Sequence, residues 1–140
     1  MILLDTNVVS ELLRLDNSPI IALWLERIGT EELATTAVTV VEIEQGLSRL
    51  PPGRRRSMLE AALADLFAPG LLGGRVFAFD HAAAVAAGRL AGELSRQGRP
   101  IDAPDALIAG IALDRRAALA TRNTRHFERV DGLRLINPWG

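Results

Sequence analysis

This sequence of 140 residues contains no cysteine and no lysine, few aromatic residues and no long apolar run. Without cysteine the chain cannot form disulfides, thiolate metal sites or a cysteine nucleophile, and its composition fits a reducing compartment. All 16 basic residues are arginine, which excludes Schiff-base lysines and the phosphate-binding lysine of P-loop proteins. No segment approaches the roughly 20 apolar residues of a membrane span, and the first residues lack the pattern of a signal peptide. We therefore expect a cytoplasmic protein with no membrane partner.

The size and composition of the chain predict one globular domain over residues 1–140. Hydrophobic residues make up 49% of the chain and charged residues 24%, which is the balance of a globular protein. The formal net charge of -1 provides no overall basic field for nucleic acid. Arginines gather locally, in the run 54–56 and at six positions between 115 and 134. Because aromatic residues are only 4% of the chain, base stacking cannot carry recognition, and any nucleic acid would be held mainly by its phosphates.

Apolar runs and capping residues predict strands that alternate with helices. The continuous apolar run Ile2–Leu4 predicts a buried strand of the parallel type. Further strands are expected at 33–36, 76–79, 117–121 and 134–136. Helices are expected at 8–13, 19–28, 38–50, 54–67, 81–97 and 105–115. This alternation predicts an α/β fold with a mostly parallel sheet, in which ligands bind at the carboxyl ends of the strands.

Three carboxylates depart from the local apolar pattern. Asp5 ends the first strand and so lies at the expected ligand edge, although a helix N-cap also explains it. Glu42 lies off the apolar stripe of helix 38–50, where an ordinary solvated glutamate is the alternative. Asp105 shares a helical face with Ile108 and Ala109, so it needs a partner such as a metal ion. Attraction to the dipole at the helix start is the alternative explanation for Asp105.

The other polar residues near these carboxylates carry weaker signals. Asp102 is expected to cap the helix that holds Asp105, and Asn123 is either a turn residue or a ligand. His81 and His126 are expected at the surface. Carboxylates at a sheet edge, without cysteine, favour Mg²⁺ or Mn²⁺ over zinc, and a hard cation with open positions suits phosphate chemistry.

Five segments, in this order and spacing, resemble one known family over nearly the whole chain. They are residues 3–11, 39–46, 105–110, 120–127 and 137–139. The sequence resembles PIN-domain ribonucleases, in particular the VapC and FitB toxins of type II toxin–antitoxin pairs. The resemblance implies a three-layer, Rossmann-like PIN fold with a mostly parallel central sheet and helices on both faces. It also implies a homodimer and a cognate antitoxin, which would make any contact with promoter DNA indirect.

The resemblance assigns roles to particular residues. Asp5, Glu42 and Asp105 occupy the three acidic positions of the family site, and Asp5 and Asp105 are expected to hold Mg²⁺. Asn123 occupies a fourth catalytic position that is often aspartate in the family. Thr6 is expected to support the site from behind with its hydroxyl. Arg122 and Arg125 are expected to bind the RNA substrate on a different ground, because they flank the site and a guanidinium group can bind two phosphate oxygens at once.

These assignments predict a Mg²⁺-dependent endoribonuclease. Water activated by the metal would attack the phosphodiester in line, leaving a 5′-phosphate and a 3′-hydroxyl. The alternative is a catalytically weakened PIN fold that binds RNA or protein, because Asn123 removes one negative charge. A receiver domain is disfavoured by the lack of lysine. An aspartyl phosphatase is disfavoured because its Asp-x-Asp motif is not met by Asp5-Thr6-Asn7.

Overall fold

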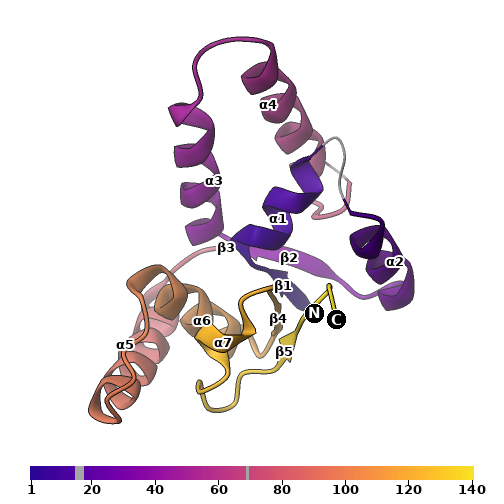
Figure 1. Ribbon diagram of the computed structural model, residues 1–140. Coiled ribbons are helices and arrows are strands. Elements are labelled where there is room, and N and C mark those ends of the chain that lie inside the picture. Colours follow the sequence, from indigo (N-terminus) through magenta and orange to yellow (C-terminus); the bar gives the residue numbers. More distant parts are fainter. Residues whose placement is uncertain (15–17, 69) are drawn as a thin grey trace.

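A five-stranded sheet lies at the centre of the computed structural model, which describes residues 1–14, 18–68 and 70–140 (Figure 1). The strand order is β3-β2-β1-β4-β5, and every pairing is parallel. The strands are β1 (Ile2–Leu4), β2 (Leu33–Thr36), β3 (Val76–Phe77), β4 (Ala118–Ala120) and β5 (Leu135–Ile136). The sheet is therefore wholly parallel, and all its strands end at one edge.

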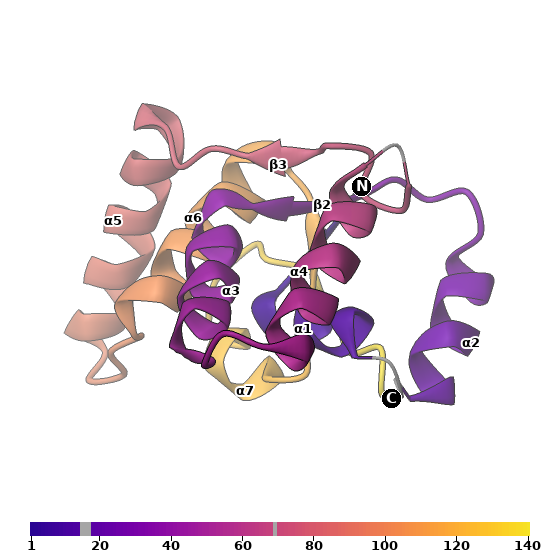
Figure 2. The same cartoon turned by 90° about the horizontal axis from the view of Figure 1, so that it is seen from above.

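Seven helices in the described part of the chain cover the two faces of this sheet. They are α1 (Thr6–Leu13), α2 (Pro19–Ile28), α3 (Ala37–Arg49), α4 (Arg54–Phe67), α5 (His81–Arg96), α6 (Ala103–Arg115) and α7 (Thr124–Phe127). Helices α1 to α4 lie on one side, and α5 to α7 lie on the other (Figures 1 and 2). The expected three-layer α/β fold is confirmed.

The side chains of β1 pack against the helices on both faces of the sheet. Successive side chains of a strand point to opposite faces of the sheet. Leu3 accordingly packs with α5 and α6, whereas Ile2 and Leu4 pack with α1, α3 and α4. All three side chains are buried, which is why the sequence shows a continuous apolar run instead of an alternating pattern.

The structure corrects several details of the expected elements, including the start of α6, which lies at Ala103 instead of 105. Helix α1 begins at Thr6, directly after Asp5, instead of at Val8. Strand β3 ends at Phe77, and Phe79 is exposed in the following loop. Helix α7 was not expected, because a single turn of four residues is too short to produce a recognisable apolar period.

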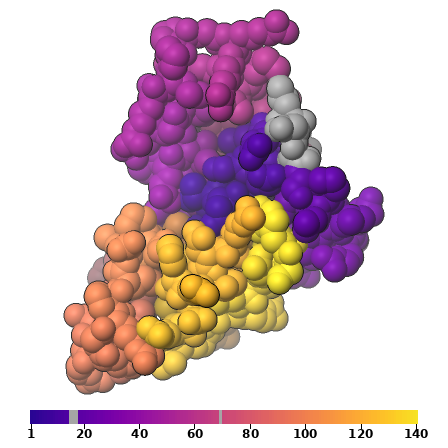
Figure 3. All heavy atoms as spheres, in the orientation of Figure 1, coloured from indigo at the N-terminus to yellow at the C-terminus, as the bar shows by residue number. Residues whose placement is uncertain are grey.

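The surface has two lobes on either side of α1. Helices α3 and α4 form the upper lobe in Figure 3, α5 to α7 form the lower one, and the indigo surface of α1 lies between them. Within the described ranges, none of the helices combines the length and apolar character that a bilayer crossing requires.

Candidate active site

Asp5 lies at the carboxyl end of β1, where the chain turns into α1. Its backbone N–H donates to the carbonyl oxygen of Ala120 at 2.9 Å, which fixes this residue beside the end of β4. The side chain is only 4% exposed. Its Oδ1 accepts from the backbone N–H of Thr6 at 2.8 Å, and its Oδ2 accepts from the hydroxyl of Thr121 at 2.7 Å. Asp5 is thus a helix cap and a buried carboxylate at the ligand edge at once, so the two explanations do not compete.

The electrostatic surroundings of Asp5 disfavour its charge. Burial raises the pKa of this carboxyl group above its ordinary value, and repulsion from Glu42 raises it further. Hydrogen bonds from Thr121 and from the Thr6 backbone lower the pKa, but they do not cancel the effect of burial. A cation bound beside Asp5 would remove this penalty, because it would pair the buried charge.

Glu42 reaches the site from the second turn of α3. This helix begins directly after β2, where the hydroxyl of Thr36 accepts from the backbone N–H of Thr39 at 3.1 Å. The Glu42 side chain is half-buried, and its Oε1 accepts from the hydroxyl of Thr6 at 2.6 Å. The same hydroxyl lies 3.1 Å from that of Thr39. Thr6 therefore supports Glu42 directly.

Asp105 enters the site from the first turn of α6. Its half-buried carboxylate lies 3.0 Å from Nδ1 of His126 on α7. Burial and the negative charge of Asp5 raise the pKa of Asp105, while the hydrogen bond with His126 lowers it. Asp102 is the N-cap residue of α6 as expected, but its side chain makes no capping hydrogen bond. His126 is therefore one partner of Asp105, and the metal ion that the sequence offered as its partner stays a prediction.

Two residues have more specific roles than the sequence suggested. The side chain of His126 is 52% exposed, as a surface residue should be, yet its ring holds the site carboxylate. Thr121, predicted only as the end of a strand, donates to Asp5 and accepts from the backbone N–H of Asn123 at 3.0 Å. The signal that could have found Thr121 is its position directly after β4, the neighbour of β1.

Asn7 and Asn123 lie beside this network in different ways. The Asn7 amide nitrogen lies 3.3 Å from Asp5 Oδ2 and from the Thr121 hydroxyl, and its oxygen accepts from the backbone N–H of Arg122. Asn123 caps α7 by position and is exposed, and its side chain makes no hydrogen bond with the described residues. Its amide is therefore free to face a ligand.

The two predicted RNA-binding arginines have different surroundings. The guanidinium of Arg122 lies 4.9 Å from the centre of the Trp139 ring, in a cation–π contact. Arg125 lines a pocket that also includes Asp105 and His126. Arg122 is thus held beside the site by the C-terminal segment, whereas Arg125 borders the site directly.

The donor chemistry fits a hard divalent cation. Asp5, Glu42 and Asp105 offer carboxylate oxygens, and Asp5 interacts electrostatically with both of the others. Across residues 1–14, 18–68 and 70–140, however, no three acidic or histidine side chains converge closely enough to form a complete ligand cluster. Mg²⁺ is commonly held by one or two carboxylates together with water and substrate phosphates. The residues present fit that kind of incomplete site.

Two concave surfaces border these carboxylates. A groove of about 1020 Å³ runs between α1, α3 and α4, and we call it the α1–α3–α4 groove. Its lining combines Thr6 and Glu42 with apolar and basic residues: Ser10, Leu13, Arg14, Ile43, Gly46, Leu47, Leu50, Arg54, Arg55, Met58 and Leu59. A smaller pocket of about 220 Å³ lies beside Asp105, and we call it the α7 pocket. It lies between the segment 99–102 and α7.

Comparisons with known proteins agree over the whole fold. The profile of the PIN domain family matches residues 2–133. The VapC ribonuclease Y4jK of Sinorhizobium fredii is 37% identical, and the match covers 99% of this chain and 98% of that protein. Toxin FitB of Neisseria gonorrhoeae is 34% identical, with 99% of each chain covered. The tRNA(fMet)-specific endonuclease VapC of Shigella flexneri is 32% identical, with 94% of this chain and 93% of that protein covered.

Solved structures give the same result. The structure of FitAB bound to an IR36 DNA fragment contains a chain with a TM-score of 0.88 and 33% identity, and the match covers 100% of this chain and 96% of that one. The crystal structure of FitAcB from Neisseria gonorrhoeae gives a TM-score of 0.87 at 34% identity, with 99% of each chain covered.

Proposed function

This chain belongs to the PIN-domain family and is a relative of the VapC and FitB toxins, and from this premise we propose that it is a Mg²⁺-dependent endoribonuclease. The observation that carries the proposal is the buried Asp5 carboxylate. It lies at the ligand edge of a parallel sheet and is electrostatically coupled to Glu42 and Asp105. Burying a carboxylate without a cationic partner is costly even when it is hydrogen-bonded, and a bound divalent cation would offset that cost.

Asp5 and Asp105 are the residues that would hold the metal. Mn²⁺ has the same preference for oxygen ligands and is the expected substitute. When bound, such an ion polarises the phosphate and lowers the pKa of a water molecule. The chain itself supplies the alignment: Thr121 and the Thr6 backbone fix Asp5, and His126 fixes Asp105.

Glu42 is assigned a different role from the two aspartates. Its Oε1 is held by the Thr6 hydroxyl, whereas its Oε2 makes no hydrogen bond with the described residues. Oε2 is therefore the atom that we assign as acceptor of the proton from the attacking water. The water oxygen would bond to phosphorus as the bond from phosphorus to the 3′ oxygen breaks, and the 3′ oxygen would take a proton from solvent water, leaving a 5′-phosphate and a 3′-hydroxyl. The free amide of Asn123 is assigned to the substrate or to a water molecule of the metal.

The test is cleavage of total RNA and of a tRNA panel by purified, antitoxin-free protein, with Mg²⁺ and with EDTA. Discrete products should vanish with EDTA and with Asp5→Asn or Asp105→Asn. The matched control is Asp114→Asn, which changes an exposed acid of α6 and should leave cleavage intact. Folded protein that binds RNA but cleaves none with any metal would instead support the alternative, a weakened PIN-fold binding module. Cleavage that persists in both site variants would refute the assigned site.

We further propose that the cognate antitoxin places an amphipathic helix in the α1–α3–α4 groove. Ile43 and Leu47 form an apolar floor, and Arg54 and Arg55 favour acidic residues on the partner. Because Glu42 lines the same groove, an occupant would block access to the site. The solved relatives at 33–34% identity come from FitAB structures, which agrees with a protein partner.

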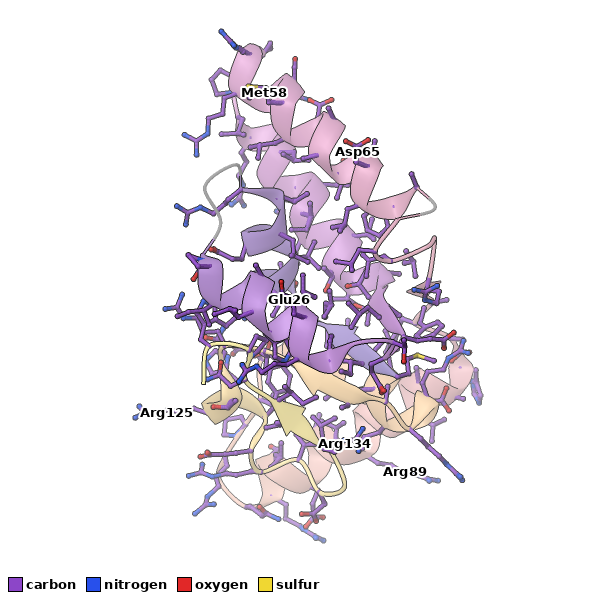
Figure 4. All side chains as sticks on the ribbon, turned by 90° about the vertical axis from the view of Figure 1, so that its right-hand side faces the viewer. Glu26, Met58, Asp65, Arg89, Arg125 and Arg134 are labelled. Atoms are coloured by element: carbon purple, nitrogen blue, oxygen red, sulfur yellow. The ribbon has the colours of Figure 1, made fainter. Side chains whose placement is uncertain are left out.

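Met58, which is 38% exposed on α4 (Figure 4), offers a test of this surface. Met58→Glu should weaken antitoxin binding at least tenfold while leaving RNA cleavage by the free protein unchanged. Leu23→Glu, on α2 outside the groove, should change neither. If Met58→Glu bound the antitoxin as tightly as Leu23→Glu does, the docking surface would be refuted. The homodimer and the indirect contact with DNA stay predictions, which sedimentation and DNA binding with and without the antitoxin would test.

A further inference from the structure

The α7 pocket joins the assigned site to a group of arginines that the sequence did not connect. The pocket is lined by Leu94, Arg99, Pro100, Ile101, Asp102, Asp105, Arg125, His126 and Arg129. Helices α6 and α7 contact each other, so the pocket lies at the junction that also holds the bond between Asp105 and His126. Anything bound in this pocket would therefore lie beside a carboxylate of the site.

The arginines of this pocket lack the partners that other arginines of the chain have. Arg56 pairs with Glu60 at 2.8 Å on α4, which is an ordinary surface ion pair. The side chains of Arg99, Arg125 and Arg129 form no ion pair or hydrogen bond with any described residue. Asp102 and Asp105 line the same pocket, so three arginines against two aspartates leave one net positive charge, and the unpaired guanidinium groups are available to an anion.

We propose that the α7 pocket binds a backbone phosphate of the RNA strand next to the phosphate that is cleaved. This inference rests on the proposed ribonuclease function. A guanidinium group can donate two parallel hydrogen bonds to one phosphate, which suits arginine to this task. The pocket volume of about 220 Å³ is below the roughly 300 Å³ at which ordinary ligand pockets begin, so it fits a phosphodiester better than an enclosed nucleotide.

The composition of the pocket also predicts what it does not recognise. Apart from His126, its lining within the described residues contains no aromatic ring on which a base could stack. Contacts to phosphate position a nucleic acid without reading its sequence. The pocket should therefore fix the register of the strand relative to Asp105 while leaving base preference to other surfaces.

Asp102 allows a test in which RNA binding should become stronger instead of weaker. This exposed acid lines the same pocket, and its side chain makes no capping hydrogen bond to α6, so its charge would repel a phosphate bound there. Removing the arginine charges should weaken RNA binding, whereas Asp102→Asn should strengthen it. A purely structural role for these exposed side chains would not produce opposite signs.

The experiment measures the binding of labelled bulk tRNA to the full chain by fluorescence anisotropy, over a series of salt concentrations with Mg²⁺ present. All binding variants carry Asp5→Asn, which should prevent cleavage. Arg99→Gln with Arg129→Gln should lower affinity at least tenfold. It should also reduce the slope of log affinity against log salt by about 0.7 to 0.9, the value for one phosphate contact. Arg89→Gln is the matched control, because Arg89 lies on α5 on the opposite side from Arg125 (Figure 4) and should change neither quantity.

A second arm follows cleavage in the protein that retains Asp5. The paired arginine variant should raise KM at least tenfold while kcat stays within threefold, and Asp102→Asn should lower KM. If the paired arginine variant cleaves RNA with unchanged KM and binds tRNA with unchanged affinity, the phosphate site is overturned while the proposed function stands. Antitoxin binding by the paired arginine variant is measured in parallel. If that variant binds antitoxin more weakly but binds tRNA as the parent protein does, the phosphate site is overturned in favour of an acidic protein partner. If no variant cleaves RNA but the paired change still weakens tRNA binding, the phosphate site stands and the ribonuclease proposal fails.

Discussion

Replacing Thr121 with valine removes one hydroxyl group behind Asp5 and changes little else in shape. That hydroxyl donates to Asp5 Oδ2 at 2.7 Å and accepts from the backbone N–H of Asn123 at 3.0 Å. Thr121 is fully buried and Asp5 is 4% exposed, so water cannot replace the lost bonds without rearrangement. The variant therefore measures how much of the stability of the site depends on satisfying one buried carboxylate.

The expected loss follows from the kind of bond removed. A hydrogen bond to a charged group contributes about 1.5–3 kcal/mol, and a neutral one contributes about 1 kcal/mol. Thr121→Val should therefore lower the free energy of unfolding by about 2–4 kcal/mol at pH 7. For a chain of this length, that corresponds to a fall in Tm of about 6–12 °C.

The loss should also depend on pH, because Thr121 lowers the pKa of Asp5. Valine lets that pKa rise further above its ordinary value. The difference between the variant and the parent protein should be fully present where Asp5 is ionised in both. It should shrink as the pH falls through the folded pKa values of the two proteins, because the protonated acid forms only a neutral bond.

Urea unfolding followed by circular dichroism in EDTA, from pH 4.5 to 8, measures this difference. Thr35→Val is the matched control: this buried hydroxyl donates to the backbone carbonyl of Leu4 at 2.8 Å, so its loss should cost about 1 kcal/mol at every pH. Combining Thr121→Val with Asp5→Asn should give a smaller loss than the sum of the two changes. A loss below 1 kcal/mol at pH 7, equal losses at all pH values, or simple additivity would refute the reasoning.

Three further outcomes are expected. In EDTA, the free energy of unfolding should decrease as the pH rises through the folded pKa of Asp5, because burial raises that pKa above its value in the unfolded chain. Asp5→Asn should remove this part of the dependence of Tm on pH. Mg²⁺ at ten times its dissociation constant should stabilise the protein by about 1.4 kcal/mol in thermal melts, but should not stabilise Asp5→Asn. Gly110→Ala should lower the free energy of unfolding in urea by about 1–3 kcal/mol, because the added Cβ would lie 2.7 Å from the Ala83 carbonyl oxygen. Gly92→Ala should raise it by up to about 1 kcal/mol, because the added Cβ would lie in open space.

Each of these outcomes has a contradicting result. A Tm profile that is identical for the parent protein and Asp5→Asn would mean that the buried carboxylate does not titrate as its surroundings require. Equal stabilisation of both proteins by Mg²⁺ would place the ion elsewhere. If Gly110→Ala and Gly92→Ala behaved alike, the close contact between α6 and α5 would not constrain the fold.

Most of the elements and the family could be predicted from the amino-acid sequence alone. The apolar run Ile2–Leu4 specified a doubly buried strand, because both of its faces lack polar residues. Capping residues and apolar periods specified six of the seven helices in the described ranges, since these signals are local. The position of Asp5 after a strand marked the ligand edge, and the five spaced segments indicated the PIN family.

Which distant residues lie in contact depends on the folded arrangement of the elements. The strand order places β4 beside β1 and so brings Thr121 to Asp5 across 116 positions of the sequence. The contact of α7 with α6 brings His126 to Asp105, and the path of the C-terminal segment places Trp139 under Arg122. A pattern of propensity and periodicity extends over about one element, so it cannot encode pairings between strands or the seating of a one-turn helix. Those pairings are fixed by burial of both sheet faces at once, which only the folded chain satisfies.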